Sequence, residues 1–175
     1  PEPLSYCSKV CCMIATKQAI VTLEHEANVK AHILYNHLQT YGKGFYEFYR
    51  RAKDLGVNYL KGKPSDVFED PKTKNLTIRF EDLDKGEVED LELDLLVLST
   101  GLIPGNRNKR LSKILKIDLD KHGFIKEKDP VNAPFETNVK GIYVCGGATG
   151  PIDISESVSQ AIGASVKAAL SRVSK

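Results

Sequence analysis

The sequence predicts an α/β protein with an open parallel sheet and an added β-hairpin, and three observations lead to this fold class. Helical and extended patterns alternate along the 175 residues, which is typical of parallel strands joined by crossover helices. Residues 95–98 form an uninterrupted apolar run, typical of a central strand covered on both faces. Residues 141–173 indicate a strand, a glycine-rich turn and a helix, which can present backbone N–H groups to an anionic cofactor.

Most of the alternating helices and strands are expected in the first part of the chain, up to residue 93. Residues 8–24 are expected to form a helix, because apolar side chains such as Val10, Met13 and Ile20 recur with the helical period. Gly56 is expected to end a second helix. The further elements expected here are strands at 30–35 and 57–62, a helix at 45–55, and a hairpin of 76–80 with 88–93 turning at 84–87.

The second part is expected to begin near Pro104. Its expected elements are a helix at 108–115, short strands at 117–119 and 124–126, a buried strand at 141–145 and a last helix at 155–173. The last helix is expected to turn its apolar face toward the core. The residues of that face are Val158, Ile162, Val166, Ala169 and Leu170.

Composition argues against several classes of protein. The 25 Lys and Arg residues nearly balance the 23 Asp and Glu residues, so neither nucleic acid nor an acidic membrane is an expected partner. No apolar run approaches the ~20 residues that span a bilayer. Four cysteines, three of them crowded together, make a poor disulfide framework, which favours a reducing, cytoplasmic setting.

The most informative feature is the run of Cys7, Cys11 and Cys12 at the start of the first predicted helix. Helical spacing would place Cys7 and Cys11 one turn apart, where the positive end of the helix dipole favours thiolates. Simple burial is the alternative, because free cysteine packs well, but adjacent cysteines cannot share one narrow apolar stripe. Thiolates suit zinc, cuprous ion or an iron–sulfur cluster. A fourth ligand would come from Cys145, from a partner or from sequence ahead of Pro1.

Two glycine-rich segments are candidates for ligand binding. At Gly146 and Gly147 the main chain can approach a ligand closely, although an ordinary strand-to-helix connection explains them equally well. Residues 42–44 more simply reverse the chain and cap a helix. Neither segment is a G-x-G-x-x-G, and neither has the lysine of a phosphate loop.

Three stretches together resemble the A subunits of the CoB–CoM heterodisulfide reductases. They are residues 6–13 (YCSKVCCM), 41–52 (YGKGFYEFYRRA) and 150–161 (GPIDISESVSQA). They occur in the order and at the spacing of that family, and the resemblance covers essentially the whole chain. The resemblance implies a truncated pyridine nucleotide-disulfide oxidoreductase (Rossmann-like) fold. Residues 1–103 would be a nucleotide-binding-like insertion domain, and residues 104–175 the C-terminal portion of the FAD-binding domain.

The resemblance also implies an iron–sulfur flavoprotein. Such proteins pass electrons through FAD toward partner subunits that reduce the disulfide of coenzymes M and B, or a related sulfur substrate. The start of the last helix would stabilise a reduced, anionic flavin. The implied FAD-binding residues are Gly101, Gly146, Gly147, Ala148, Thr149, Ser155, Glu156 and Ser157, and no catalytic residue is implied.

The chain departs from the family pattern in several places. Gly147 stands where an Asp usually holds the ribityl hydroxyls, and the first FAD fingerprint and the ferredoxin-type cysteine repeats are absent. A further family cysteine lies in a strand ahead of the cysteine run, so Pro1 is interpreted as a cut. Cys7, Cys11 and Cys12 would then be three ligands of a [4Fe-4S] cluster whose fourth ligand lies off the chain.

The leading hypothesis is therefore a fragment or split subunit that contributes cluster ligands and one wall of an FAD site, and that is inactive alone. Its expected partners are the remainder of the A subunit and the B and C subunits of the heterodisulfide reductase, with a hydrogenase or formate dehydrogenase type of donor; the isolated chain is prone to self-associate. Two alternatives stay open. One is a cofactor-free docking module. The other is a free-standing NAD(P)H-dependent disulfide reductase using Cys11 or Cys12, which would lack its usual cysteine pair and dinucleotide fingerprint.

Overall fold

A computed structural model describes residues 4–173, and the chain divides into two compact units. The sheet unit is Cys11–Thr100, and the terminal unit combines residues 4–10 with the chain from Gly101 onward. The predicted domain boundary at residue 103 lies close to the point between Thr100 and Gly101 where the chain leaves the sheet unit. Residues 4–10, however, belong to the terminal unit, because they are hydrogen-bonded to the segment that follows Thr100. Which functional domain each unit represents stays a prediction.

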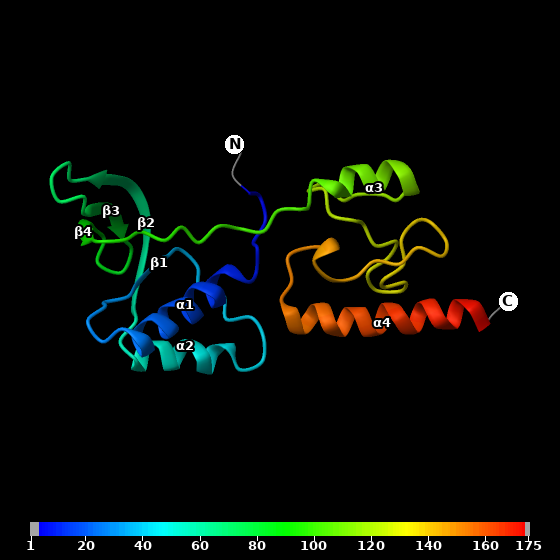
Figure 1. Ribbon diagram of the computed structural model, residues 1–175, viewed down its shortest axis with the longest axis horizontal. Coiled ribbons are helices and arrows are strands. Elements are labelled where there is room, and N and C mark those ends of the chain that lie inside the picture. The colour runs from blue at the N-terminus through cyan, green and yellow to red at the C-terminus, as the bar shows by residue number, and fades with distance from the viewer. Residues whose placement is uncertain (1–3, 174–175) are drawn as a thin grey trace. The chain divides into compact units, whose positions relative to one another are not determined.

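A four-stranded mixed sheet forms the sheet unit (Figure 1), in the order β1-β2-β3-β4. Its strands are β1 (His32–Tyr35), β2 (Asn58–Glu69), β3 (Leu76–Asp82) and β4 (Glu87–Leu93). β1 and β2 are parallel, whereas β2–β3 and β3–β4 are antiparallel, so the predicted hairpin is confirmed. β2 is longer than predicted because it changes partner at Gly62, pairing with β1 before it and with β3 from it onward. A Cβ on Gly62 would lie 2.4 Å from the carbonyl oxygen of Glu81, so this close approach requires glycine.

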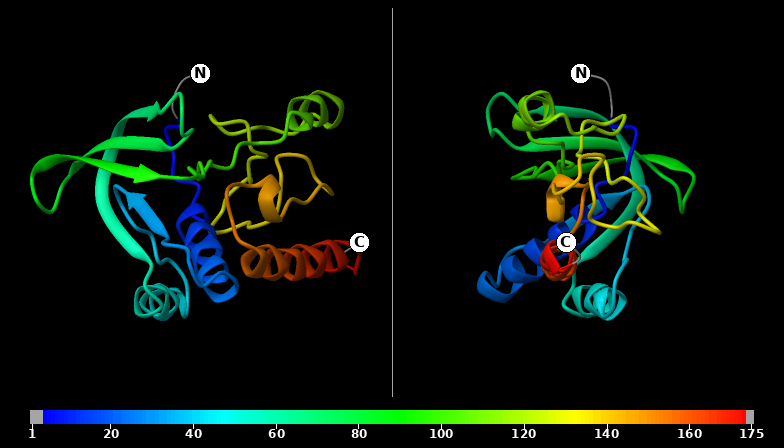
Figure 2. Two further views of the ribbon diagram at one scale, coloured as in Figure 1. Left: turned by 60° about the vertical axis from the view of Figure 1, so that its left-hand side comes forward. Right: turned by 90° about the vertical axis from the view of Figure 1, so that its right-hand side faces the viewer.

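Two helices, α1 (Cys11–His25) and α2 (Phe45–Asp54), lie side by side in the views of Figures 1 and 2. Ile20 of α1 and Ala52 of α2 form a buried cluster with Val57, and β1 and β2 contribute further apolar side chains to it. α2 matches its prediction and is followed by Gly56 at φ 97°. α1 begins three residues later than predicted, because Lys9 adopts a left-handed φ of 64° that a helix cannot contain.

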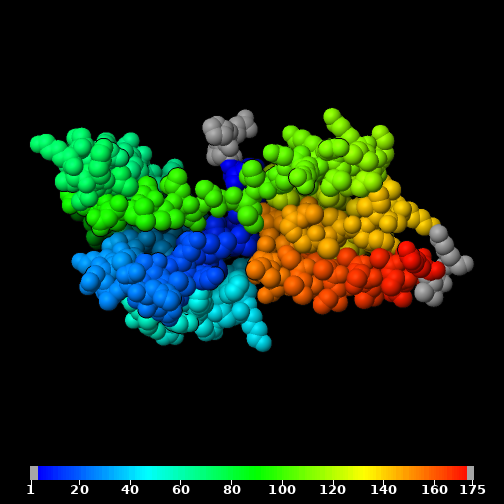
Figure 3. All heavy atoms as spheres, viewed as in Figure 1, coloured from blue at the N-terminus to red at the C-terminus, as the bar shows by residue number. Residues whose placement is uncertain are grey.

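The predicted central strand at residues 95–98 is wrong. This stretch has no strand structure, and the side chains of Leu95, Val97 and Leu98 are 75%, 67% and 74% exposed. In Figure 3 the green chain that follows β4 lies at the visible surface. An apolar run becomes a buried strand only beside another strand, and within residues 4–173 no neighbouring strand pairs with it.

The terminal unit is built from helices and irregular loops. Its helices are α3 (Arg107–Leu115), the short 3₁₀ helix η1 (Gly146–Ala148) and α4 (Ile154–Val173). The predicted strands at 117–119, 124–126 and 141–145 are wrong, because the structure gives only isolated bridges at Leu119–Ile125 and Glu136–Tyr143. Their apolar side chains are nevertheless buried, and Ile117, Ile125 and Val144 form the core of the unit. These runs therefore pack as loops, without the pairing that would extend them into a sheet.

The orientation of α4 also differs from the prediction. The helix forms as expected, but all five side chains predicted to face inward are exposed. Ala164 is buried instead, and an atom of the Phe135 ring lies 2.5 Å from the position that a Cβ of Gly163 would take. The face of α4 that carries the small residues Gly163 and Ala164 therefore packs on the core, because the Phe135 ring lies directly against the helix backbone there. Among the described residues, no helix is both long and apolar enough to cross a bilayer.

Candidate functional site

The three cysteines of the predicted metal site lie in two different parts of the fold. Cys7 lies in residues 4–10 of the terminal unit, whereas Cys11 and Cys12 form the first turn of α1 in the sheet unit. The prediction that helical spacing places Cys7 and Cys11 one turn apart is therefore wrong, because the helix starts only at Cys11. Within the described part of the chain, no three His, Cys, Asp or Glu residues are arranged to hold a metal ion. A three-cysteine site stays a prediction from the spacing.

The three sulfurs have different surroundings. The backbone N–H of Lys9 donates a hydrogen bond to the Sγ of exposed Cys7, at 3.2 Å. Cys11 and Cys12 are half-buried at the positive end of α1, whose first turn contains no acidic residue. The thiol of Cys12 donates to the carbonyl oxygen of His37, with the sulfur 3.8 Å from the oxygen. Thiolates at helix starts and beside N–H donors are favoured ligands for soft metals, so the donor set fits an iron–sulfur group.

Residues 4–10 are held by contacts that the sequence did not reveal. The hydroxyl of Tyr6 donates to the carbonyl oxygen of Leu102 at 2.9 Å, and the N–H of Leu102 donates to the Oγ of Ser8 at 2.7 Å. The Tyr6 ring also packs on His122, with ring centroids 4.5 Å apart. Tyr6 and Ser8 thus flank Cys7 on either side and fix the backbone that carries it. Both residues stand in the 6–13 motif, but nothing in the sequence pointed to partners about a hundred positions away.

Gly101, one of the predicted FAD-binding residues, lies against these same anchors. A Cβ at this position would come within 2.6 Å of both Leu4 Cδ1 and Ser8 Oγ. Packing against residues 4–10 therefore explains the need for glycine here without a ligand. The predicted contact of Gly101 with FAD remains untested.

The predicted cofactor segment at residues 146–149 forms η1 and its cap. Gly146 adopts a left-handed φ of 68°, and its N–H donates to the side-chain Oε1 of Gln160 on α4 at 2.8 Å. Thr149 returns its hydroxyl to the carbonyl of Gly146 at 2.9 Å, and Ala148 packs on the terminal core. Beside Gly147 there is open space where a Cβ would lie. The backbone at Gly147 is therefore the part of this segment that a ligand can approach.

The start of α4 is capped by its own carboxylates. The N–H of Glu156 donates to Asp153 Oδ1 at 2.7 Å, and the N–H of Asp153 donates to Glu156 Oε2 at 3.3 Å, which is a capping box. Ser157 donates its hydroxyl to the carbonyl of Asp153, and the carbonyl of exposed Ser155 accepts from Ser159. The other carboxylate oxygen of Glu156 pairs with the ammonium group of Lys9.

This arrangement changes the electrostatics of the helix start. Two carboxylates already occupy the positive end of α4, where the prediction placed an anionic flavin. The Lys9 ammonium balances one of these negative charges. Glu156 therefore acts as a capping and pairing residue in the structure, and Ser155 remains exposed beside it.

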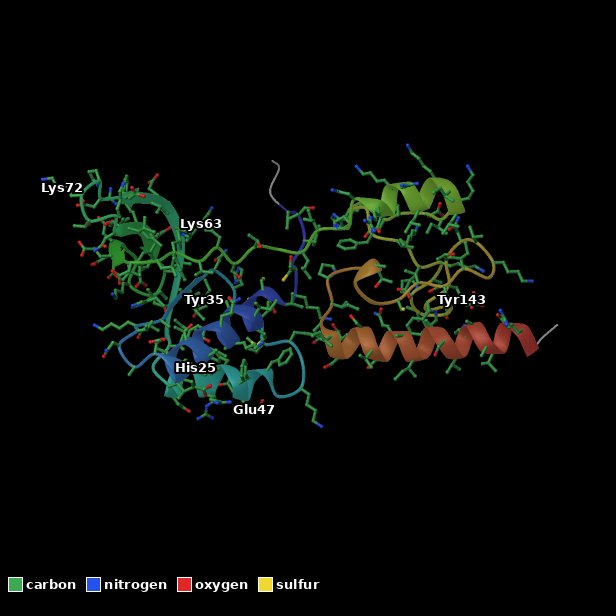
Figure 4. The ribbon with its side chains drawn as sticks, viewed as in Figure 1. His25, Tyr35, Glu47, Lys63, Lys72 and Tyr143 are labelled. Atoms are coloured by element: carbon green, nitrogen blue, oxygen red, sulfur yellow. The ribbon has the colours of Figure 1, made fainter. Side chains whose placement is uncertain are left out.

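A hollow of about 400 Å³ opens at the carboxyl end of β1 in the sheet unit. Tyr35, labelled in Figure 4, lies at its edge together with Tyr46 and Tyr49 of α2 and Lys61 of β2. Residues 42–44 form the loop just before α2. Gly42 and Gly44 adopt positive φ values of 121° and 82° there, and Gly44 is the residue that caps the start of the helix. This geometry accounts for both glycines as helix-starting residues. The remaining lining residues are Asn36, His37, Leu38, Gln39 and Thr40.

The tyrosines near this hollow form a connected group. Tyr49 packs edge-on against Tyr59 at 4.7 Å, and the Tyr59 hydroxyl lies 2.9 Å from the hydroxyl of buried Thr16. Burial raises the pKa of Tyr59, with Tyr49 and Cys12 adding to the effect, although the hydrogen bond with Thr16 opposes it. Burial raises the pKa of Tyr35 as well. Both phenols therefore stay neutral at physiological pH, and of the two Tyr35 lines the hollow as a hydrogen-bonding group.

A second hollow of about 210 Å³ lies in the terminal unit, near Pro104, Lys109 and His122. None of the predicted cofactor or metal residues lines either of the two hollows. The structure therefore brings Lys9, Cys7 and Glu156 into one cluster, and it groups Gly146 with Thr149. It does not gather the predicted residues around one enclosed cavity.

The chain is closely similar to known proteins. The family model described as pyridine nucleotide-disulphide oxidoreductase matches residues 12–168. The iron-sulfur A subunit of the CoB–CoM heterodisulfide reductase of Methanocaldococcus jannaschii is 45% identical over 160 residues, covering 91% of this chain and 24% of that protein. The A subunit of the H₂/formate:CoB–CoM heterodisulfide,ferredoxin reductase of Methanococcus maripaludis is 45% identical over 166 residues, covering 94% and 25%.

A more distant relative gives the same result. A protein of Archaeoglobus profundus, described as similar to the A subunit of heterodisulfide reductase, is 36% identical over 157 residues, covering 90% of this chain and 22% of that protein. The predicted resemblance to these subunits is thus confirmed, and so is the predicted fold class. The chain spans about a quarter of the length of the curated relatives it matches.

Proposed function

Because this chain belongs to the pyridine nucleotide-disulphide oxidoreductase family, we propose that it is an electron-transferring segment of an oxidoreductase of the heterodisulfide reductase type. The observation that carries the proposal is the 45% identity across 94% of the chain to the A subunit of a heterodisulfide,ferredoxin reductase. The chain corresponds to 25% of that relative. It is proposed to supply part of the electron path and to be inactive alone. Its substrate is the CoM-S-S-CoB heterodisulfide or a related sulfur compound, reached through partner subunits.

The cysteine run is the proposed metal site. Cys7, Cys11 and Cys12 supply three thiolates to a [4Fe-4S] cluster, and a cubane cluster needs four ligands, so the fourth ligand is proposed to lie on a polypeptide segment other than this chain. The Lys9 N–H donates to the Cys7 sulfur, and Cys11 and Cys12 lie at the positive end of α1, so these positions are suited to anionic sulfur ligands of a bound metal. Tyr6 and Ser8 hold Cys7 in place while the other two ligands follow from α1.

The terminal unit is proposed to supply one wall of an FAD site. Bound FAD supplies the exchange between two-electron and one-electron chemistry. The open backbone at Gly147 gives it an approach, and the segment Gly146–Thr149 is held rigid by Gln160. Ser155 and Ser157 offer hydroxyls at the helix start, and the Lys9–Glu156 pair keeps that start from repelling an anion as strongly as two bare carboxylates would.

Partner proteins are part of the proposal, because the relatives are named as A subunits. The remainder of the A subunit would complete the flavin site, and the B and C subunits would receive the electrons, with a hydrogenase or formate dehydrogenase type of enzyme as donor. All four cysteines are thiols rather than disulfides. This supports a reducing compartment, and we place the protein in the cytoplasm.

Iron reconstitution without oxygen tests the metal site. The chain and its Cys7→Ser, Cys11→Ser and Cys12→Ser variants are compared by iron and sulfide content and by electron paramagnetic resonance after reduction. Each of the three variants should lose most of the iron bound by the parent chain. Cys145→Ser is the matched control, because it removes the fourth cysteine and should leave iron uptake unchanged. Uptake that is equal in all four variants would exclude the proposed ligands.

A cofactor-free docking module is the second candidate, favoured by the exposed apolar face of α4. The same reconstitution separates the two. A chain that takes up no iron and binds no flavin in the presence of a full-length partner subunit supports the docking module.

A further inference from the structure

Lys9 lies at the centre of a very tight turn. The backbone N–H of Val10 donates a hydrogen bond to the carbonyl oxygen of Ser8, two positions back, at 2.6 Å. Lys9, between them, has a φ of 64°. A γ-turn whose central residue has a positive φ is rare and strained, because the Cβ of an L-residue crowds its own backbone there. A lysine keeps this conformation only where its surroundings stabilise it.

The side chain of Lys9 provides a stabilising contact. Its ammonium group forms an ion pair with Oε1 of Glu156, while the other oxygen of that carboxylate accepts the N–H of Asp153 in the capping box of α4. The capping box therefore orients the carboxylate that meets Lys9. All three residues belong to the terminal unit, so the contact lies within one compact body. Glu156 thus ties the strained residue to the first turn of α4.

The strained turn directs an N–H group at the sulfur of Cys7. The backbone N–H of Lys9 donates to this sulfur at 3.2 Å. Ser8, which lies between the two residues, is buried, and its Oγ accepts the N–H of Leu102. The terminal unit thus fixes the two consecutive residues that follow Cys7. Because Ser8 is held in place, the direction of the N–H relative to the sulfur depends on the conformation of Lys9.

We propose that Lys9 is a positioning residue for Cys7: its γ-turn, held by Glu156, keeps the Lys9 N–H on the Cys7 sulfur and thereby raises the reduction potential of the bound cluster. The effect on the potential rests on the proposed function, in which Cys7 is a cluster ligand. Hydrogen bonds to ligating sulfurs are among the factors that set such potentials. A donor stabilises the reduced cluster more than the oxidised one, because the reduced cluster carries one more negative charge.

The positive charge of the ammonium group would also raise the potential, so the test needs variants of equal charge. Lys9→Gly and Lys9→Ala both remove the ammonium group and keep the backbone N–H. Glycine adopts a positive φ without strain, whereas alanine does not. The glycine variant should therefore keep more of the γ-turn than the alanine variant. Lys9→Arg keeps the charge and the pair with Glu156, so it is the conservative control.

Amide hydrogen exchange of the metal-free chain, followed by nuclear magnetic resonance, tests the turn. Protection of the residue 9 amide, relative to an unstructured peptide of the same sequence, should be about tenfold lower in Lys9→Ala than in Lys9→Gly. Lys9→Arg should match the parent chain. Glu156→Gln should lower the protection in the parent chain and leave it unchanged in the Lys9→Gly chain, which has no ion pair to lose. Equal protection in the glycine and alanine variants would overturn the proposal.

Redox titration of the chain reconstituted with iron and sulfide tests the consequence for the cluster. The reduction potential should be more negative in Lys9→Ala than in Lys9→Gly, and Lys9→Arg should keep the potential of the parent chain. Equal potentials in the glycine and alanine variants would mean that charge alone acts, and the proposal would be wrong. A parent chain that takes up no iron would refute the proposed metal site and the effect on the potential together, whereas the exchange rates still decide whether Lys9 positions Cys7.

Discussion

The ammonium group of Lys9 and the carboxylate of Glu156 form an ion pair between residues 147 positions apart in the sequence. Lys9 also donates its backbone N–H to the sulfur of Cys7, and Glu156 caps the first turn of α4. One residue therefore links the proposed metal ligand to the helix start that borders the proposed flavin site. A change in the position of this pair should therefore alter both the backbone beside Cys7 and the first turn of α4.

A double-mutant cycle measures how strongly the pair is coupled. Lys9→Met removes the charge, and Glu156→Gln removes the partner while an amide oxygen can still complete the capping box. Because both side chains are about a third exposed, the coupling energy in the free energy of unfolding should be about 0.5–1 kcal/mol. Urea unfolding of the four proteins gives this value. Lys126→Met, an exposed lysine of the same unit, should show no coupling with Glu156→Gln, and equal coupling for both lysines would contradict the assignment.

The hydroxyls of Thr16 and Tyr59 give a second prediction. Thr16 is fully buried, and Tyr59 is its hydrogen-bond partner at 2.9 Å. Tyr59→Phe should therefore destabilise the sheet unit by about 1–3 kcal/mol, because a buried hydroxyl loses its partner. Thermal unfolding followed by circular dichroism checks this. Tyr46→Phe is the matched control, since Tyr46 is 56% exposed, and its change should stay within about 0.5 kcal/mol.

The two faces of α4 should respond oppositely to substitution. Ile162→Lys places a charge on the exposed face and should change the free energy of unfolding of the monomer by no more than about 0.5 kcal/mol. Ala164→Leu adds bulk to the buried face and should cost about 1–3 kcal/mol by overpacking. Chemical unfolding at low protein concentration compares the two variants. A large loss for Ile162→Lys with none for Ala164→Leu would show that the helix is turned the other way.

Local patterns predicted the elements whose neighbours lie close in the sequence. The apolar face of residues 45–55 and the stop at Gly56 were sufficient for α2, and the turn at Gly86 was sufficient for the β3–β4 hairpin. Residues 95–98 failed because an apolar run does not show whether a second strand is available beside it. α4 failed in orientation only, because the helical period shows which side chains share a face but not which face meets Phe135.

The candidate site was predictable to a similar degree. Crowding alone drew attention to Cys7, Cys11 and Cys12, and the resemblance named the glycine segment. The anchors Tyr6, Ser8 and Lys9 were not assigned roles, because their partners Leu102 and Glu156 lie 94 to 147 positions away. Contacts of that separation depend on the completed fold and leave no local pattern.

The ion pair between Arg79 and Asp90 predicts how the stability of the hairpin depends on pH. Arg79 of β3 donates two hydrogen bonds to the carboxylate of Asp90 on β4, Nε to Oδ1 and Nη2 to Oδ2, both at 2.8 Å. These bonds hold the pKa of Asp90 below its ordinary value of 3.8, although burial opposes them. A carboxyl whose pKa is lowered on folding stabilises the protein above its unfolded pKa and loses that effect as the pH falls through its folded pKa.

Replacing this carboxylate should therefore have an effect that depends on pH. Asp90→Asn should lower the free energy of unfolding at neutral pH, and the difference from the parent chain should shrink below pH 3.8. Urea unfolding at a series of pH values measures this difference. Glu92→Gln removes a carboxylate from the same strand and leaves the Arg79 pair intact, so it should show a smaller change over that range. A loss for Asp90→Asn that is the same at every pH would mean that the contact acts through packing rather than charge.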